Sequence, residues 1–198
     1  MKQINYPGGI FAVVALVFSS LFTLAGAAHA QVYMTKHGHV QFVSHSTLED
    51  FTGKSDYLVG RINLADSTVQ FYIDLTTVST GVRLRDEHMQ EEYLQTDKYP
   101  FAQFSGKIVS SFNPASADTQ QVTVKGTFKV HNVSHVITVS GKVKISPQKL
   151  YVYAAWPVKL GDYNIRIPQV LFMKVSPTQA VSISTTLDRT KNDKSSKP

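Results

Sequence analysis

Apolar and polar residues alternate along most of this chain, a pattern typical of half-buried β-strands. In residues 122–130, valine, glycine and phenylalanine at even positions alternate with polar side chains at odd positions. Similar runs occupy residues 39–45, 51–64, 69–75, 101–112, 136–145, 150–158 and 181–187. Most of the breaks between them are short and turn-like, although residues 161–168 are irregular. The pattern predicts about eight antiparallel strands, and their sequential order favours an up-and-down barrel over a Greek-key sandwich.

Residues 78–105 interrupt this pattern with the densest charged segment of the chain. The charged and histidine side chains in it are Arg83, Arg85, Asp86, Glu87, His88, Glu91 and Glu92. Its apolar residues have helical spacing and are Met89, Tyr93 and Leu94. We expect one short amphipathic helix here, with Thr80 as its N-cap and an end before Pro100, which disfavours helical backbone in the preceding residue.

Two local sequence features bear on how the strands bend and turn. Gly53 and Gly60 lie inside a predicted long strand, where glycine permits a bend or a bulge. Residues 131–135 separate two predicted strands and read as a hairpin, because Asn132 tolerates the left-handed backbone that a tight turn needs.

The first thirty residues have the pattern of a secretory signal peptide. Lys2 precedes an apolar run over residues 10–24, and Ala28-His29-Ala30 is a small-x-small cleavage signal. The alternative is an uncleaved anchor, but the run is shorter than the ~20 residues that a membrane span needs. We therefore expect a mature chain that begins at Gln31, is periplasmic or secreted, and has no integral membrane span.

Composition indicates one globular domain over residues 31–188. The chain has 198 residues, 42% of them hydrophobic, and no cysteine, which excludes thiol catalysis and thiolate metal sites. The formal charge is +6, and +5 without the predicted signal peptide. Residues 189–198 are polar and lysine-rich and are predicted to be a disordered tail. The remaining body is only mildly basic, which argues against a nucleic-acid binder.

Several short motifs recur in a fixed order along the chain. They are Arg85-Asp86-x-His88-Met89, Lys98-Tyr99-Pro100-x-Ala102-x-Phe104, Val124-x-Gly126-x-Phe128-x-Val130 and Asp162-Tyr163-x-Ile165. With them, residues 37–188 resemble the YceI-like family of exported lipocalin-like proteins. The resemblance implies an extended antiparallel barrel around a long apolar tunnel. It also implies a bound polyisoprenoid or quinone-like lipid rather than any other cofactor.

This resemblance and the alternation together suggest a set of ligand-binding residues. Apolar and aromatic side chains would line the tunnel, namely Phe71, Ile73, Phe104, Phe128 and Trp156. Arg85, Asp86 and His88 would form its polar end, where Arg85 offers bidentate donors to a lipid head group. Alternatively, Asp86 or His88 ties the short helix to the barrel. Alternation is equally consistent with a hollow barrel and a packed one, because cavity volume depends on barrel shear.

The sequence gives little support to metal binding or catalysis. His37, His39 and His45 would share one strand face, but we expect them to be solvated residues at a strand edge. Asp86 and His88 are two positions apart on a helix, so Asp86 cannot readily orient His88, and no nucleophile or phosphate-loop motif is present.

We therefore predict a binding protein and not an enzyme. It would be an exported carrier that holds a long isoprenoid-type lipid in its barrel. The alternative is a ligand-free structural or protein-interaction barrel in the periplasm. In that case the protein could form a homodimer through an exposed strand face. The predicted solvent-facing residues that suit such an interface are Tyr72, Tyr151 and Tyr153.

Overall fold

The structure is a computed structural model and describes residues 31–46, 49–166, 169–170 and 173–190. The predicted signal peptide, residues 1–30, and most of the predicted tail, residues 191–198, lie outside the described residues.

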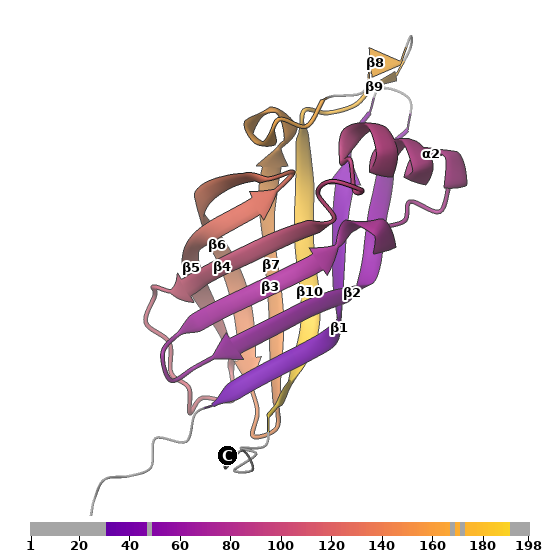
Figure 1. The fold of residues 1–198 in the computed structure, drawn as a ribbon. Helices are drawn as coiled ribbons and strands as arrows, with labels where there is room; N and C mark the ends of the chain where they lie inside the picture. Colours follow the sequence, from indigo (N-terminus) through magenta and orange to yellow (C-terminus); the bar gives the residue numbers. More distant parts are fainter. Residues whose placement is uncertain (1–30, 47–48, 167–168, 171–172, 191–198) are drawn as a thin grey trace, which may run out of the picture.

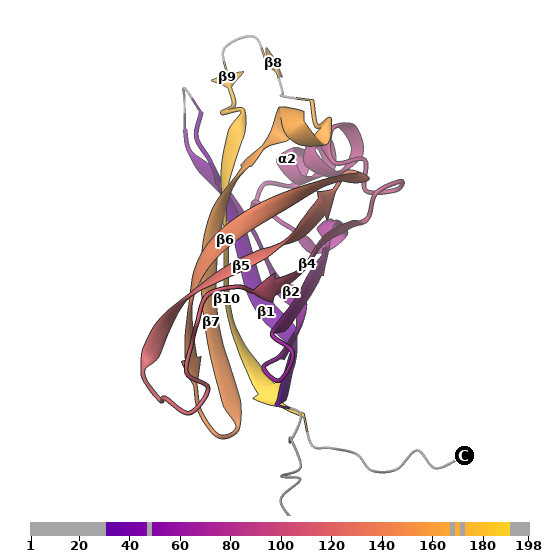
Figure 2. The same ribbon diagram turned by 90° about the vertical axis from the view of Figure 1, so that its left-hand side faces the viewer.

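Eight long strands form one closed antiparallel barrel, as the alternation predicts (Figures 1 and 2). They are β1 (Val32–Ser44), β2 (Phe51–Asn63), β3 (Thr68–Asp74), β4 (Phe101–Ile108), β5 (Thr119–Val130), β6 (Val133–Ile145), β7 (Lys149–Lys159) and β10 (Thr178–Arg189). Each strand pairs with its neighbour in sequence, and β10 closes the ring by pairing with β1. The prediction of a lipocalin-like up-and-down barrel is therefore confirmed.

Several strand boundaries differ from those read from the sequence, and three of the differences bear on the predictions. β1 begins at Val32, earlier than expected, because bulges on both sides of Gly38 shift the phase of its inward residues and conceal the alternation. β4 ends at Ile108, so the expectation of a strand to residue 112 is wrong. β10 continues to Arg189, one residue into the predicted tail.

The predicted turn between β5 and β6 is confirmed. His131 and Asn132 both have positive φ values, 50° and 58°, between the paired residues Val130 and Val133. Two successive left-handed residues are the geometry of a type I′ hairpin, which matches the twist of the flanking strands.

The charged insert is helical, but it departs from the expected single helix. A 3₁₀ turn η1 (Leu75–Thr77) precedes α2 (Arg83–His88), which continues as a π-helical turn η2 (Met89–Tyr93). The expectation that Thr80 caps the helix is wrong, because Val82 occupies the N-cap position and makes no side-chain cap bond. Thr80 instead donates two hydrogen bonds to the Asp86 carboxylate.

Two small elements lie between β7 and β10 at the same end of the barrel as α2 (Figure 1). The first is a 3₁₀ turn η3 (Leu160–Tyr163), and the second is the short hairpin β8 (Gln169–Val170) and β9 (Met173–Lys174). No helix in the described ranges is long and apolar enough to cross a membrane.

The opposite end of the barrel is filled by side chains. Tyr33, Leu150 and Leu187 are 2%, 0% and 0% exposed. Leu150 and Leu187 are direct partners on β7 and β10, and the Tyr33 hydroxyl donates to the backbone carbonyl of Ser146 at 3.4 Å. This end is a packed apolar plug, whereas the end that carries α2 and η3 is open.

Candidate functional site

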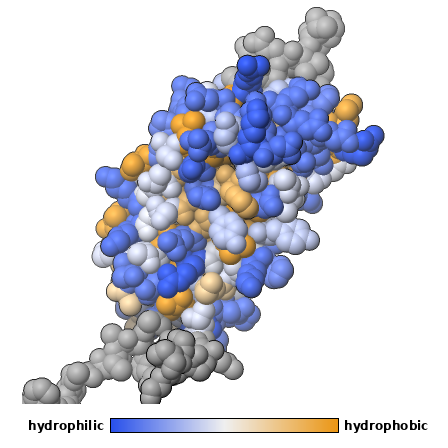
Figure 3. All heavy atoms as spheres, viewed as in Figure 1, coloured by the Kyte–Doolittle hydropathy of each residue, from blue (hydrophilic) through white to orange (hydrophobic). Residues whose placement is uncertain are grey.

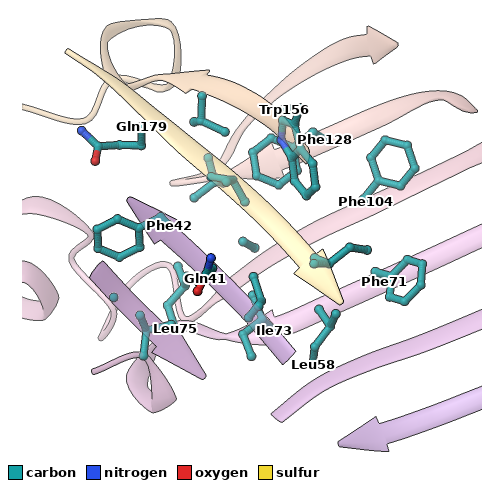
Figure 4. Close-up of a pocket in the computed structure, with 18 of the residues that line it drawn as sticks. Gln41, Phe42, Leu58, Phe71, Ile73, Leu75, Phe104, Phe128, Trp156 and Gln179 are labelled. Atoms are coloured by element: carbon teal, nitrogen blue, oxygen red, sulfur yellow. The ribbon is translucent and has the colours of Figure 1, made fainter. Parts of the chain in front are cut away.

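A cavity of about 550 Å³ occupies the barrel between the plug and the helical end (Figure 4). This volume lies within the ~300–1,000 Å³ range of ordinary small-molecule sites. Inward-facing residues of all eight barrel strands line it, and almost all of them are apolar. The question that alternation leaves open is therefore answered, because this barrel is hollow between the plug and the helical end.

The aromatic rings of β1 and β3 lie against the wall and do not cross the cavity. Gly60 pairs directly with Phe71, and Gly53 pairs with Phe42. A Cβ atom would lie 2.1 Å from the Phe71 ring at residue 60, and 2.2 Å from the Phe42 ring at residue 53. Each ring thus occupies the space that a side chain would fill on the neighbouring strand, which leaves the centre of the barrel open. Receiving a ring is a role that the sequence did not indicate for these glycines, and the irregular pairing of β2 with β1 lies between them.

A second aromatic group forms the far wall of the cavity. Phe104 and Phe128 are paired across β4 and β5. The ring of Phe128 makes edge contacts with Trp156, 5.8 Å between centroids, and with Tyr163, 5.5 Å. The indole Nε1 of Trp156 is buried and has no hydrogen-bond partner within the described part of the chain.

The turn η3 closes a gap in the barrel wall beside these rings. β6 and β7 pair only between Gly141 and Ile145 on the β6 side, so their upper halves separate. Two histidine rings bridge from β6 and its turn to η3. His131 Nδ1 donates to the Tyr163 carbonyl at 3.1 Å, and His135 Nε2 donates to the Asp162 carbonyl at 2.8 Å. Sequence reasoning placed both histidines in a hairpin and missed this role, since nothing in the local sequence indicates a partner about thirty residues away.

We call the open end of the cavity, beside α2, the mouth. Figure 3 shows the outer face on this side of the molecule, where α2 is mostly hydrophilic and apolar residues gather on the barrel below the helix. Val82 and Leu84 line the cavity and are also 46% and 57% exposed, so the cavity reaches solvent beside α2. Neither α2 nor η2 contains a fully buried residue. The helical segment therefore covers the mouth, and only Met89 and Tyr93 of η2 pack, partly buried, against the core.

Seven of the eight residues proposed from the sequence line this cavity. They are Phe71, Ile73, Phe104, Phe128 and Trp156 on the strands, and Arg85 and His88 on α2. The guanidinium of Arg85 lies 4.5 Å above the ring of Phe51, a cation–π contact that holds its donors at the mouth. Arg166 also lines the mouth, and the sequence offered no signal for it.

Asp86 is not among the lining residues, and its carboxylate holds the segment before the helix. Ser79 Oγ donates to it at 2.6 Å, and Thr80 donates through its backbone N–H at 2.7 Å and its hydroxyl at 2.6 Å. Burial would raise the pKa of Asp86, but these hydrogen bonds outweigh burial and lower the pKa below its ordinary value. This geometry matches the structural alternative considered for Asp86.

Two of the three histidines considered for a metal site, His39 of β1 and His45 just after it, form separate pairs with carboxylates. His39 Nδ1 lies 2.6 Å from Asp56 Oδ1, and His45 Nδ1 lies 2.6 Å from Asp50 Oδ2. Over the described ranges, no group of three or more histidine, cysteine or acidic side chains could hold a metal ion.

Comparison with solved structures finds the same fold in proteins of low sequence identity. A polyisoprenoid-binding domain from Saccharophagus degradans, implicated in plant cell wall breakdown, has a TM-score of 0.68 at 22% identity, and the match covers 81% of this chain and 99% of that one. Burkholderia cenocepacia BcnA has a TM-score of 0.63 at 14% identity, with 75% and 95% covered.

Sequence comparison gives the family. Protein YceI of Shigella flexneri and Protein YceI of Escherichia coli O157:H7 are each 28% identical to this chain over 167 residues, which cover 78% of this chain and 86% of each relative. The model of the YceI-like domain matches residues 31–187, which include every strand of the barrel apart from the last two residues of β10. The chain therefore belongs to the YceI-like domain family.

Proposed function

We propose that this protein is an exported carrier that sequesters a long isoprenoid-type lipid, a polyprenyl chain or a quinone with such a tail, in its barrel. The observation that carries the proposal is the apolar cavity, which is closed by a plug at one end and open beside α2 at the other. A linear apolar chain fits such a space, because it can extend from the mouth toward the plug. In this proposal the protein binds its lipid and does not transform it.

Apolar burial would supply most of the affinity. Each Å² of lipid surface removed from water contributes about 25 cal/mol, from which the cost of association subtracts. The branched methyl groups of an isoprenoid would pack between the rings of Phe71, Phe128 and Trp156. These rings come from three different strands and surround the lumen in Figure 4.

The polar residues at the mouth would bind the head group. Arg85 and His88 both line the cavity on the α2 side. Because the cation–π contact with Phe51 leaves the guanidinium donors free to bind, Arg85 can donate to a phosphate, hydroxyl or carbonyl oxygen. The head group would then lie near solvent and the tail near the plug.

Two further observations support this proposal. A structural relative is described as a polyisoprenoid-binding domain. The N-terminal thirty residues have the sequence of a cleavable secretory signal, which supports a periplasmic or secreted location. The hollow lumen disfavours the alternative of a ligand-free filled barrel.

The decisive experiment is mass spectrometry of organic-solvent extracts from the mature protein, purified after export from its native host. We expect a stoichiometric prenyl lipid or quinone, and an N-terminus at Gln31. An empty extract, together with no uptake of added prenyl lipids, would overturn the carrier proposal.

A matched pair of variants locates the bound lipid. Trp156→Asp places a charge inside the lumen and is expected to abolish loading. Ala155→Asp places the same charge on the outer face of the same strand, where Ala155 is exposed, and is expected to leave loading unchanged. Equal loading of the two variants, both shown to be folded by circular dichroism, would count against binding in the lumen.

A further inference from the structure

The charges of this protein are divided between two parts of the barrel. Residues 101–160, which form β4 to β7, contain seven lysines and one acidic residue, Asp118. Residues 31–100, which form β1 to β3 and the helical insert, contain ten acidic and six basic residues. Because consecutive strands are neighbours in the barrel, this division in sequence is also a division in space.

The lysines of β5 and β6 project outward together with two tyrosines of β7. Lys142 is paired with Tyr153, and Lys144 with Tyr151, across neighbouring strands. All four side chains are exposed, and so is that of Lys125 on β5. We name Lys125, Lys142, Lys144, Tyr151 and Tyr153 the lysine–tyrosine face. Figure 2 shows its strands, β5 to β7, toward the viewer and α2 behind them.

The positive charge of this face is largely uncompensated. Lys149 and Lys159, at the two ends of β7, form ion pairs with Asp188 and Asp162. Within the described part of the chain, the three lysines of the lysine–tyrosine face form no such pair. Lys125 even lies directly opposite Lys107, an arrangement of like charges that destabilises a sheet. Folding alone therefore does not account for this concentration of charge.

We propose that the lysine–tyrosine face docks the barrel onto an anionic phospholipid bilayer. Lysine provides a mobile point charge that suits the diffuse negative potential of such a surface, and this face has no arginine, the residue suited to bidentate recognition of a particular partner. Tyrosine prefers the interface between water and lipid, where its ring is apolar and its hydroxyl is wet. Docking here extends the proposed carrier function, since a lipid carrier must meet the membrane, but it does not depend on the identity of the cargo.

Co-sedimentation of the mature protein with vesicles tests the proposal. We expect binding to vesicles of 30% phosphatidylglycerol in phosphatidylcholine at low salt, release at high salt, and no binding to pure phosphatidylcholine. The variant Lys125→Gln/Lys142→Gln/Lys144→Gln should bind about 100-fold more weakly, because each lysine contributes about fivefold. Tyr151→Ser/Tyr153→Ser should also weaken binding while keeping its salt dependence.

A control variant separates this face from the net charge of the protein. Lys36→Gln/Lys54→Gln/Lys98→Gln removes the same charge from exposed lysines of the first half of the chain and is expected to change affinity less than threefold. Equal weakening of vesicle binding by the two triple variants would overturn the proposal. Failure of the wild-type protein to bind anionic vesicles would also overturn it, and is the result expected if the face binds an acidic protein. Because vesicle binding is measured with empty and lipid-loaded protein alike, its failure is distinguishable from failure of the carrier function.

Discussion

The ring of Phe71 lies directly over Gly60 of the neighbouring strand, close enough to fill the space of a missing side chain. An aromatic ring on the inner face of a barrel would otherwise extend toward the barrel axis. The glycine gives the ring a place on the wall, and an open lumen follows. The size of the cavity thus depends on a small residue that does not itself contact the centre of the barrel.

Gly60→Ala is therefore expected to reduce lipid loading sharply. The new Cβ would lie 2.1 Å from the Phe71 ring, which would have to swing into the lumen. Gly161→Ala is the matched control, since nothing lies within 4 Å of a Cβ at that position. Binding of a fluorescent prenyl lipid to both variants measures the effect. Full loading of Gly60→Ala would show that the Phe71 ring can adopt another position that does not block the lumen.

Because one end of the barrel is packed and the rest is hollow, the same leucine-to-alanine substitution should lower the free energy of unfolding by different amounts in the two places. Leu150→Ala removes a fully buried side chain from the plug and should lower the free energy of unfolding by about 3–5 kcal/mol. Leu58→Ala changes a residue that is almost as buried, at 3% exposed, but lines the cavity, where the leucine already lacks contacts on one side. Its cost should be nearer the ~2 kcal/mol lower limit. Urea denaturation of both variants without ligand makes the comparison, and equal costs would contradict the hollow lumen.

The sequence predicts the barrel itself well, because alternation reports directly which residues face inward. It predicts the same inward direction for Phe71 and Phe128, yet it cannot tell where each ring lies. The position of the Phe71 ring depends on its register with Gly60, a property of the strand pairing and not of either strand alone.

Two further features of the structure could not be predicted from the local pattern of apolar and polar residues. The bridge from His135 to the Asp162 carbonyl joins segments 27 residues apart, and its donor and acceptor have no distinctive local sequence. The start of β1 is concealed by the bulges around Gly38, which put Tyr33 and Gly38 on the same inward face despite their odd separation.

The bridge from His135 to η3 should stabilise the closed wall. His135→Phe keeps the ring contact with Tyr163, whose centroid lies 5.1 Å away, but loses the N–H donor to the Asp162 carbonyl. We expect a loss of about 1 kcal/mol in the free energy of unfolding, the usual net value of one hydrogen bond. Faster hydrogen exchange of the η3 amides would place the effect at this turn. Unchanged exchange and stability would show that the bridge contributes nothing there.

The carboxylate of Asp86 should hold the segment before α2 in a pH-dependent way. Asp86→Asn keeps the shape of the side chain and is expected to cost about 1–2 kcal/mol at pH 7, since it weakens the bonds from Ser79 and Thr80. The pKa of Asp86 is lowered in the folded protein, so its stabilising effect is complete above the unfolded value of about 3.9 and is lost as the pH falls through the lower folded value. Stability curves of wild type and Asp86→Asn should therefore separate near neutral pH and converge in acid. Glu91→Gln, a change of the same kind at an exposed residue of η2, is the control, and its stability should follow that of wild type at every pH. A constant difference in the free energy of unfolding between wild type and Asp86→Asn down to pH 2 would rule out ionised Asp86 as the source of the stability.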